Sequence, residues 1–194
     1  MQADFVLTKE KSREFSRSRA FDLALIGVCS AILTAGKLVL SFVPNVEVVT
    51  LFILVFSSAL GTRRTFLITL CFCVTETIIY GFGTWVPAYF IHWNLLGLSG
   101  ALLLRRCGAV RAVALAALFT VAFGGLTSLI DVLFAAAGGV ESSQLFRLFE
   151  LYYVRGIWFY GTHFVSNVII TAVLFFPLSA ALKTILFRTE PREI

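Results

Sequence analysis

The chain has 194 residues, of which 59% are hydrophobic and only 14% are charged, and its mean hydropathy is +0.92. Soluble domains carry about 25% charged residues, so this composition excludes a soluble domain and predicts an all-α integral membrane protein in contact with the lipid bilayer. The length allows about six membrane-spanning helices of ~20 residues with their loops. The net charge of +5 is explained by membrane topology, and no nucleic-acid partner is expected.

Six apolar runs alternate with short polar or basic connections along the chain. The predicted transmembrane spans are 21–42, 48–60, 65–80, 88–104, 112–137 and 156–182. The first 19 residues are polar and of mixed charge, so a cleavable signal peptide is not expected. We predict a cytoplasmic tail over 1–19, a six-helix membrane domain over 20–187 and a second cytoplasmic tail over 188–194. Segment 138–155 is expected to be a polar connection with some helix.

The basic residues predict the orientation of the chain. Thirteen of the 16 Lys and Arg residues lie at one set of span ends, whereas the opposite ends hold only Arg147 and Arg155. Because cytoplasmic loops are enriched in Lys and Arg, both termini are expected to be cytoplasmic. We expect a multi-pass protein of a prokaryotic plasma membrane.

Ionisable residues within the spans are concentrated toward the outer face. With a helix rise of 1.5 Å per residue, the distance from the nearest basic loop is about 18 Å for Glu76, about 20 Å for His92, about 27 Å for Lys37 and about 30 Å for Asp131 and His163. Such groups cost at least a few kcal/mol each unless they face a cavity or a partner. The distribution predicts a hydrated cavity open only to the outside. Alternatively, Lys37 and Asp131 lie at the level of the lipid headgroups.

The segment 80–94 is dense in aromatic residues and separates two apolar runs. Gly81, Gly83 and Pro87 are expected to break a helix there. Trp85 and Trp93 each combine an apolar body with one N–H group, which is typical of a membrane–water boundary. The segment therefore predicts one wall of a binding pocket at the outer face. An aromatic belt around an ordinary loop is the alternative interpretation.

Small residues recur every four positions in the first span, at Gly27, Ala31 and Ala35. This spacing allows a second helix to approach closely. The face is therefore either a packing seam inside the bundle or a docking surface for a separate membrane subunit.

No cofactor chemistry is indicated by the sequence. The four cysteines form no Cys-x-x-Cys pair, so neither a zinc ribbon nor a disulfide framework is expected, and no metal site is assigned. The Walker A pattern is also missing, so any use of ATP must come from partner proteins.

Together, the six predicted spans, the cytoplasmic termini and the Gly27-Val-Cys-Ser-Ala31 motif resemble the S component of energy-coupling factor (ECF) vitamin transporters. One branch of that family carries three further motifs. Pro-Asn-Val-Glu is matched at 44–47, and Tyr-Gly-Phe-Gly-x-Trp is matched at 80–85. The third, Gly-x-Pro-Phe-Asp-x-x-His-x-x-x-Asn, is matched at Gly156, Phe159, His163 and Asn167. Trp158 and Tyr160 replace its Pro and Asp.

The resemblance implies a substrate-binding subunit of an ECF-type ABC importer, which is not itself an enzyme. Such a subunit captures a vitamin or related micronutrient from the outside and topples within the membrane to release it. A transmembrane coupling subunit and two ATPase subunits, as partners, drive uptake.

The residues expected to contact this vitamin-like ligand lie in the outer loops and the outer ends of the spans. Asn45 and Glu47 are expected to form hydrogen bonds. The remaining candidates are Trp85, Trp93 and Trp158 for stacking on a flat ring, and His92, Tyr153, Arg155, His163 and Asn167 for polar contacts. Gly27, Ala31 and Ala35 are expected to dock the coupling subunit.

Two other classes of protein share some of these features. A rhomboid-type intramembrane serine protease also has six spans, and Gly97-Leu98-Ser99-Gly100 with His163 resembles its dyad. Ser99 is about 9 Å from the inner face and His163 is about 30 Å from it. This vertical separation of about 20 Å is too large for a base to activate a serine. No catalytic residue is therefore assigned. A membrane sensor that does not transport is the third class.

Overall fold

The computed structural model describes residues 2–105 and 108–189, with side chains from Arg19 onward. All regular secondary structure in these two ranges is helical. The helices are α1 (Gln2–Val39), α2 (Val49–Tyr80), α3 (Trp85–Leu103), α4 (Ala109–Ala137), α5 (Ser142–Arg155) and α6 (Ile157–Thr189). Five of them, all except α5, are long and apolar enough to cross a membrane. The chain is thus all-helical, as the sequence predicts for a multi-pass membrane protein.

Helix α2 is the centre of the bundle, and it packs against α1, α3, α4 and α6. It is apolar around most of its circumference, which is the pattern of a buried helix. Ile53, Ile68 and Phe72 are fully buried. Hydrogen bonds also connect α2 to its neighbours. Ser30 of α1 donates one to the Ile68 carbonyl (3.2 Å). On the other side, the Thr69 hydroxyl donates to Asn94 Oδ1 of α3 (2.8 Å).

Helix α2 contains two of the predicted spans, 48–60 and 65–80, and it is interrupted between them at Gly61 (φ 75°, ψ 179°). This backbone conformation is essentially restricted to glycine. A Cβ placed on Gly97 of α3 would lie within 4 Å of both Ile53 and Thr69. Sixteen residues of straight helix would separate those two side chains by about 24 Å. The two halves of α2 therefore fold back on each other as a helical hairpin.

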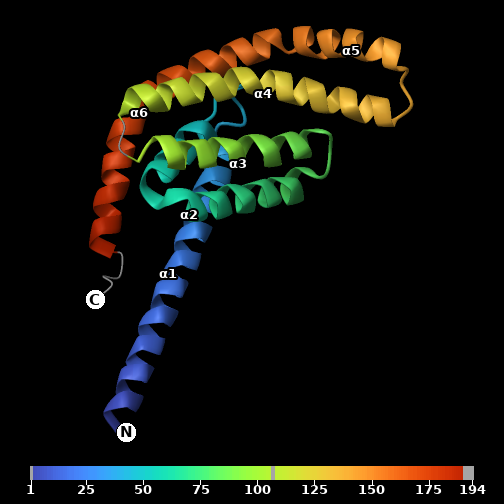
Figure 1. Ribbon diagram of the computed structural model, residues 1–194. Helices are drawn as coiled ribbons and strands as arrows, with labels where there is room; N and C mark the ends of the chain where they lie inside the picture. Colours follow the sequence, from blue (N-terminus) through green and yellow to red (C-terminus); the bar gives the residue numbers. More distant parts are fainter. Residues whose placement is uncertain (1, 106–107, 190–194) are drawn as a thin grey trace.

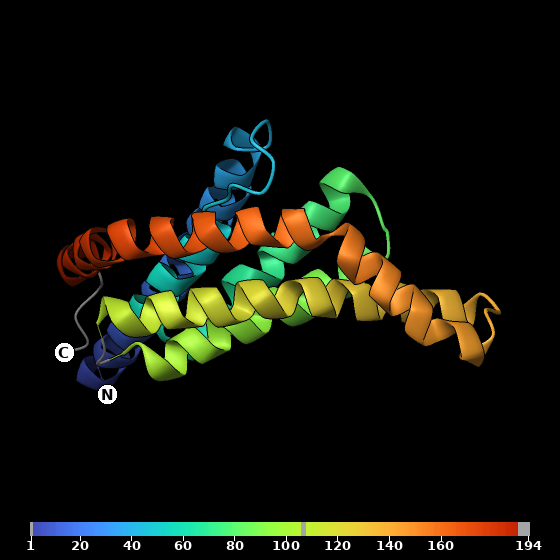
Figure 2. The ribbon, with the colours of Figure 1, turned by 90° about the horizontal axis from the view of Figure 1, so that it is seen from above.

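The two ends of the bundle differ in chemistry. In Figure 2 the start of α1, the end of α6, the end of α3 and the start of α4 lie on one side, and the α2–α3 and α4–α5 connections lie on the other. The first side, which we call the basic end, holds the Asp22–Arg64 ion pair (2.7 Å) and the Arg105 guanidinium next to Gly61. The opposite side is called the cavity end below. The first half of α1 projects away from the other helices (Figure 1).

Four boundaries differ from those predicted. Residues 2–19 continue α1 as helix, and most of the expected connection 138–155 forms α5. Pro87 lies in the first turn of α3 and does not break it, because the N–H that proline lacks has no helical partner there. Helix α6 continues past Pro177 to Thr189. Of the expected tail 188–194, residues 190–194 lie outside the described residues.

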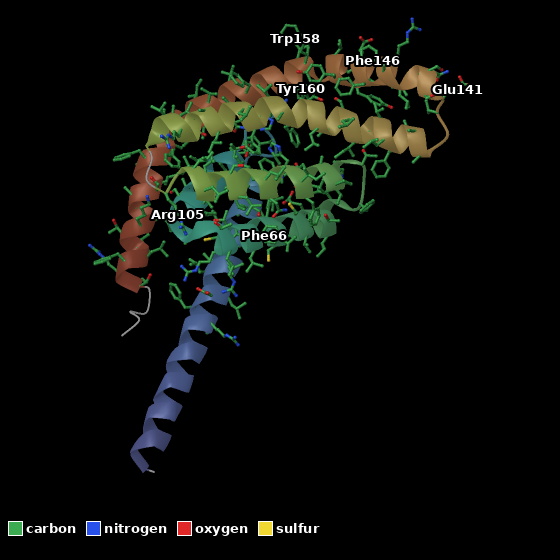
Figure 3. All side chains as sticks on the ribbon, viewed as in Figure 1. Phe66, Arg105, Glu141, Phe146, Trp158 and Tyr160 are labelled. Carbon is green, nitrogen blue, oxygen red and sulfur yellow. The ribbon has the colours of Figure 1, made fainter. Side chains whose placement is uncertain are left out.

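The outer surface of the bundle is strongly apolar. Leu23 of α1, Leu133 of α4 and Phe176 of α6 are all more than half exposed. Helix α5 buries none of its side chains, and Phe146 and Trp158 point away from the bundle (Figure 3). Water-soluble proteins rarely expose large contiguous apolar patches. Lipid is therefore the solvent that suits this surface.

The bend at Gly61 gives a direct test of the hairpin. Gly61→Ala should lower the stability of the protein by about 1–3 kcal/mol, because an L-residue is strained at this φ and ψ. The new Cβ would also lie 2.9 Å from the Arg105 guanidinium. Thermal unfolding of the detergent-purified protein measures the loss.

Gly125→Ala is the matched control, since Gly125 is helical and a Cβ added to it would meet no atom within 4 Å. This variant should be unchanged or more stable by about 0.5–1 kcal/mol. Equal melting temperatures for Gly61→Ala and the wild-type chain would contradict a glycine-dependent hairpin.

Candidate ligand-binding site

A cavity of about 520 Å³ opens at the cavity end of the bundle. Its walls come from the end of α1, the connection 40–48, both ends of α2, and α3, α4 and α6. The residues that line it are Lys37, Leu40, Ser41, Val43, Pro44, Asn45, Val46, Glu47, Val49, Tyr80, Tyr89, Trp93, Phe123, Phe159, Tyr160 and His163. Its volume falls within the range of about 300–1,000 Å³ that is usual for small-molecule sites.

The connection 40–48 forms one rim of the cavity and is fixed by α6. Asn45 has a positive φ of 60°, a conformation that asparagine tolerates better than most residues. The Ser166 hydroxyl of α6 donates a hydrogen bond to the Asn45 carbonyl (2.9 Å). The loop backbone adds a hydrogen bond from the Val43 N–H to the Leu40 carbonyl (2.9 Å). The Pro-Asn-Val-Glu segment is therefore a structured turn.

Glu47 ends this turn and connects α2 with α6. Its carboxylate accepts the Thr50 N–H (3.0 Å) and the Thr50 hydroxyl, and it lies 3.3 Å from His163 Nε2. Burial raises the pKa of Glu47, but hydrogen bonds from His163 and Thr50 and attraction to the His163 ring favour the carboxylate more strongly. The pKa of Glu47 therefore lies below its ordinary value of 4.5. At neutral pH this wall of the cavity carries a negative charge.

A second ion pair joins α1 to the second half of α2. The Lys37 ammonium bonds to Oε2 of Glu76, and the Glu76 side chain is fully buried. The same ammonium lies 4.5 Å from the ring centre of Tyr80 and 5.0 Å from that of Tyr89, within the range of cation–π attraction. Lys37 is therefore held by a carboxylate and two rings.

Aromatic rings form a continuous wall from α3 to α4. Trp85 packs edge-on against Tyr89 (4.9 Å between ring centres), and Tyr89 packs against Trp93 (5.7 Å). His92 is buried between Trp93 (4.6 Å) and Phe123 (4.8 Å). The Trp93 N–H is buried and finds no acceptor among the described residues, although buried indoles usually have one.

The floor of the cavity is closed. Asn167 of α6 is buried and donates hydrogen bonds to the hydroxyls of Thr50 in α2 (3.2 Å) and Thr120 in α4 (3.0 Å). Toward the basic end, the core contains the fully buried aliphatic side chains Leu33, Ile53, Leu54, Ile68 and Leu96. A packed apolar core thus lies beneath the cavity, and a second, smaller cavity of about 210 Å³ next to Ser58, Leu104 and Ser179 lies toward the basic end.

The ten predicted ligand residues fall into four groups. The cavity lining contains Asn45, Glu47, Trp93 and His163. Trp85, His92 and Tyr153 touch the lining from behind, through Tyr89, Trp93 and Tyr160 respectively. Asn167 is one residue further away, because it bonds to Thr50, which in turn bonds to the lining residue Glu47. Arg155 and Trp158 are exposed outside the cavity, and Trp158 is 87% exposed. Figure 3 shows Trp158 at the outer edge of the molecule.

Several lining residues were not predicted from the sequence. These are mainly Lys37, Tyr80, Tyr89, Phe123, Phe159 and Tyr160. The signal that could have identified Lys37 was the presence of one buried cation and one buried carboxylate, Glu76, in nearby spans. Tyr80 and Tyr89 lie in the segment 80–94 that was predicted to form a pocket wall, although neither was named as a ligand contact. Phe123, Phe159 and Tyr160 carried no such signal, because 20 Phe and 5 Tyr are distributed over the whole chain.

Gly27, Ala31 and Ala35 are exposed on α1, and a Cβ on Gly27 would meet no atom within 4 Å. Within the described part of the chain, this face is therefore not a packing seam. In the described part of the chain, no three His, Cys, Asp or Glu side chains are grouped so that they could hold a metal ion.

Comparison with known proteins gives no further identification, since no family model, curated protein or solved structure matches the chain.

The Lys37–Glu76 pair can be tested by removing its members singly and together. Lys37→Met should destabilise the protein by about 3 kcal/mol, since it leaves a buried carboxylate without its cation. The double variant Lys37→Met/Glu76→Leu should recover at least half of that loss. Thermal unfolding in detergent gives both values.

Lys183→Met is the control for loss of a lysine, because Lys183 is exposed on α6. Its effect should stay within about 0.5 kcal/mol. A double variant that is no more stable than Lys37→Met would show that the two side chains are not coupled.

Proposed function

We propose that this chain is the substrate-binding subunit of an ECF-type ABC importer, which captures a vitamin or related micronutrient from outside the cell. The observation that carries the proposal is the cavity of about 520 Å³, which is lined with aromatic and ionisable side chains at one end of an apolar bundle. A subunit that binds and then hands over its ligand needs a pocket open to one face and closed beneath. Channels need polar groups along the whole path.

The proposed topology has six crossings with both termini in the cytoplasm of a prokaryotic cell. The two arms of the α2 hairpin are counted as separate crossings, and the basic end faces the cytoplasm. Arg63, Arg64 and Arg105 cluster at that end, in agreement with the positive-inside rule. The cavity then opens to the outside, where a scarce nutrient is captured.

Two features of the site suit a flat, hydrogen-bonding ligand. The rings of Tyr89, Trp93 and Phe123 supply stacking or edge contacts for a planar molecule. The Glu47 carboxylate and the His163 ring, which line the same cavity, supply groups that can hydrogen-bond to a ligand. No Walker A motif occurs in the sequence, so ATP hydrolysis is assigned to two partner subunits.

The exposed small-residue face of α1 suits a docking surface for the transmembrane coupling subunit. Gly27, Ala31 and Ala35 leave room for a second helix to approach closely. Because no part of the described chain covers Gly27, the partner would be a separate protein.

A serine protease is the weaker candidate. His163 contacts Glu47 and Phe123 at the cavity end. Gly100, the neighbour of Ser99, packs on Ser57, which lies about 12 Å along α2 from Val49. The base and the serine are thus at different levels of the bundle, beyond the hydrogen-bond reach that activation of a nucleophile requires.

Thermal-shift screening of the purified chain against a panel of vitamins tests the proposal. A ligand that binds only the folded state at 100 times its Kd stabilises it by about 2.7 kcal/mol, so one compound should raise the melting temperature. The variant Gly27→Leu/Ala31→Leu should keep this shift and lose co-purification of the coupling subunit and its ATPases.

Ala114→Leu/Ala122→Leu, which adds the same bulk to an exposed face of α4, should keep both properties. A vitamin shift without any ATPase partner would favour a sensor. A panel without a single shift would contradict the proposed function.

A further inference from the structure

The charge balance of the cavity points to the charge of its ligand. One ammonium, that of Lys37, is present with two carboxylates, those of Glu47 and Glu76. Lys37 is already bonded to Glu76 and covered by two tyrosine rings. Glu47 is the cavity-lining carboxylate that no Lys or Arg side chain is found to neutralise within the described residues, and its Oε1 lies 3.3 Å from His163 Nε2.

The Glu47 carboxylate retains capacity to accept a further donor. Its Oε1 accepts the Thr50 hydroxyl and, at 3.3 Å, the Thr50 N–H, and it faces His163. Within the described residues, the one hydrogen bond found for Oε2 comes from the same Thr50 N–H (3.0 Å). A carboxylate can accept about four hydrogen bonds. The side chain is 15% exposed and lines the cavity, so a donor on a ligand can reach it.

The aromatic walls already bind one cation. Tyr80 and Tyr89 face the Lys37 ammonium at 4.5 and 5.0 Å, which shows that ring faces at this site are presented to positive charge. Trp93, Phe123, Phe159 and Tyr160 add four more rings to the lining. Aromatic faces attract cations and repel anions through the ring quadrupole. An anionic ligand would meet these faces and the Glu47 carboxylate, and the lysine that lines the cavity is already paired with Glu76.

From these contacts we propose that the cavity selects a flat organic cation, such as a heteroaromatic ring with a charged nitrogen, over neutral or anionic molecules of the same shape. The positive nitrogen lies toward Glu47, and the ring lies against the aromatic wall formed by Tyr89, Trp93 and Phe123. This inference rests on the proposed function and adds to it the chemical class of the captured ligand.

Three planar probes of similar size and different charge test the inference. They are the cation N-methylacridinium, neutral acridine and the anion of anthracene carboxylate. Binding to the full detergent-purified chain is followed by probe and tryptophan fluorescence at mildly alkaline pH, where acridine is uncharged. The cation should bind at least about tenfold more tightly than either of the others.

Two pairs of variants locate the source of the preference. Glu47→Gln should lower the cation's advantage by about tenfold, whereas Glu150→Gln, which removes an exposed carboxylate on α5, should leave it unchanged. Tyr89→Leu should reduce the advantage and Tyr89→Phe should retain it, because only the first removes the ring. Tyr89 lines the cavity and is only partly buried, so this pair remains informative if Glu47→Gln does not fold.

The outcomes separate this inference from the proposed function. Equal or tighter binding of the anion, or an unchanged preference in both Glu47→Gln and Tyr89→Leu, would overturn cation selection and leave vitamin capture standing. Failure of all three probes to bind would also overturn the inference, and the vitamin panel alone would then decide the proposed function. Cation preference together with a negative vitamin panel would support the inference and count against capture of a vitamin.

Discussion

Charged side chains in an apolar bundle must be paired or must face water, and the cavity end is built on this constraint. Lys37 and Glu76 satisfy it together by bonding across α1 and α2. Glu47 and His163 do so across the connection 40–48 and α6. Each pair joins segments that are far apart in the sequence. Aromatic side chains form most of the rest of the cavity wall. The position of the cavity therefore follows from where the chain has placed its charges.

Much of the fold could be predicted because the signals are local. Apolar runs predicted the helices, and an all-helical structure with spans of membrane length was found. The sequence did not predict that 48–60 and 65–80 would form one hairpin through a single residue. A Gly-Thr-Arg-Arg connection looks like a short loop, whereas the structure needs only the unusual backbone of Gly61 to reverse the helix. Helix α5 was underestimated because its apolar residues are interrupted by Arg147 and Glu150.

The part of the candidate site that could be predicted from the sequence consists of ionisable residues, because such side chains are energetically costly within a membrane. Glu47 and His163 were identified by charge and by motif, and both line the cavity. Trp158 was assigned by aromatic character alone, and the helical phase of α6 places it on the outer surface instead. Tyr160, two residues later, points inward and packs on Gly124. The sequence identifies the ionisable groups that need a partner or a cavity. Which of the many aromatic residues line that cavity follows only from the three-dimensional structure.

A water-accessible cavity at one face, above a dry and closed core, is the arrangement on which the proposed function rests. Thiol labelling in right-side-out membrane vesicles tests it, in a chain whose four native cysteines have been replaced. Ser41 lines the cavity and is exposed, whereas Ser57 is fully buried toward the basic end. We expect Ser41→Cys to react with a membrane-impermeant maleimide added outside and Ser57→Cys to react from neither side. Labelling of Ser57→Cys, or protection of Ser41→Cys from outside, would contradict this arrangement.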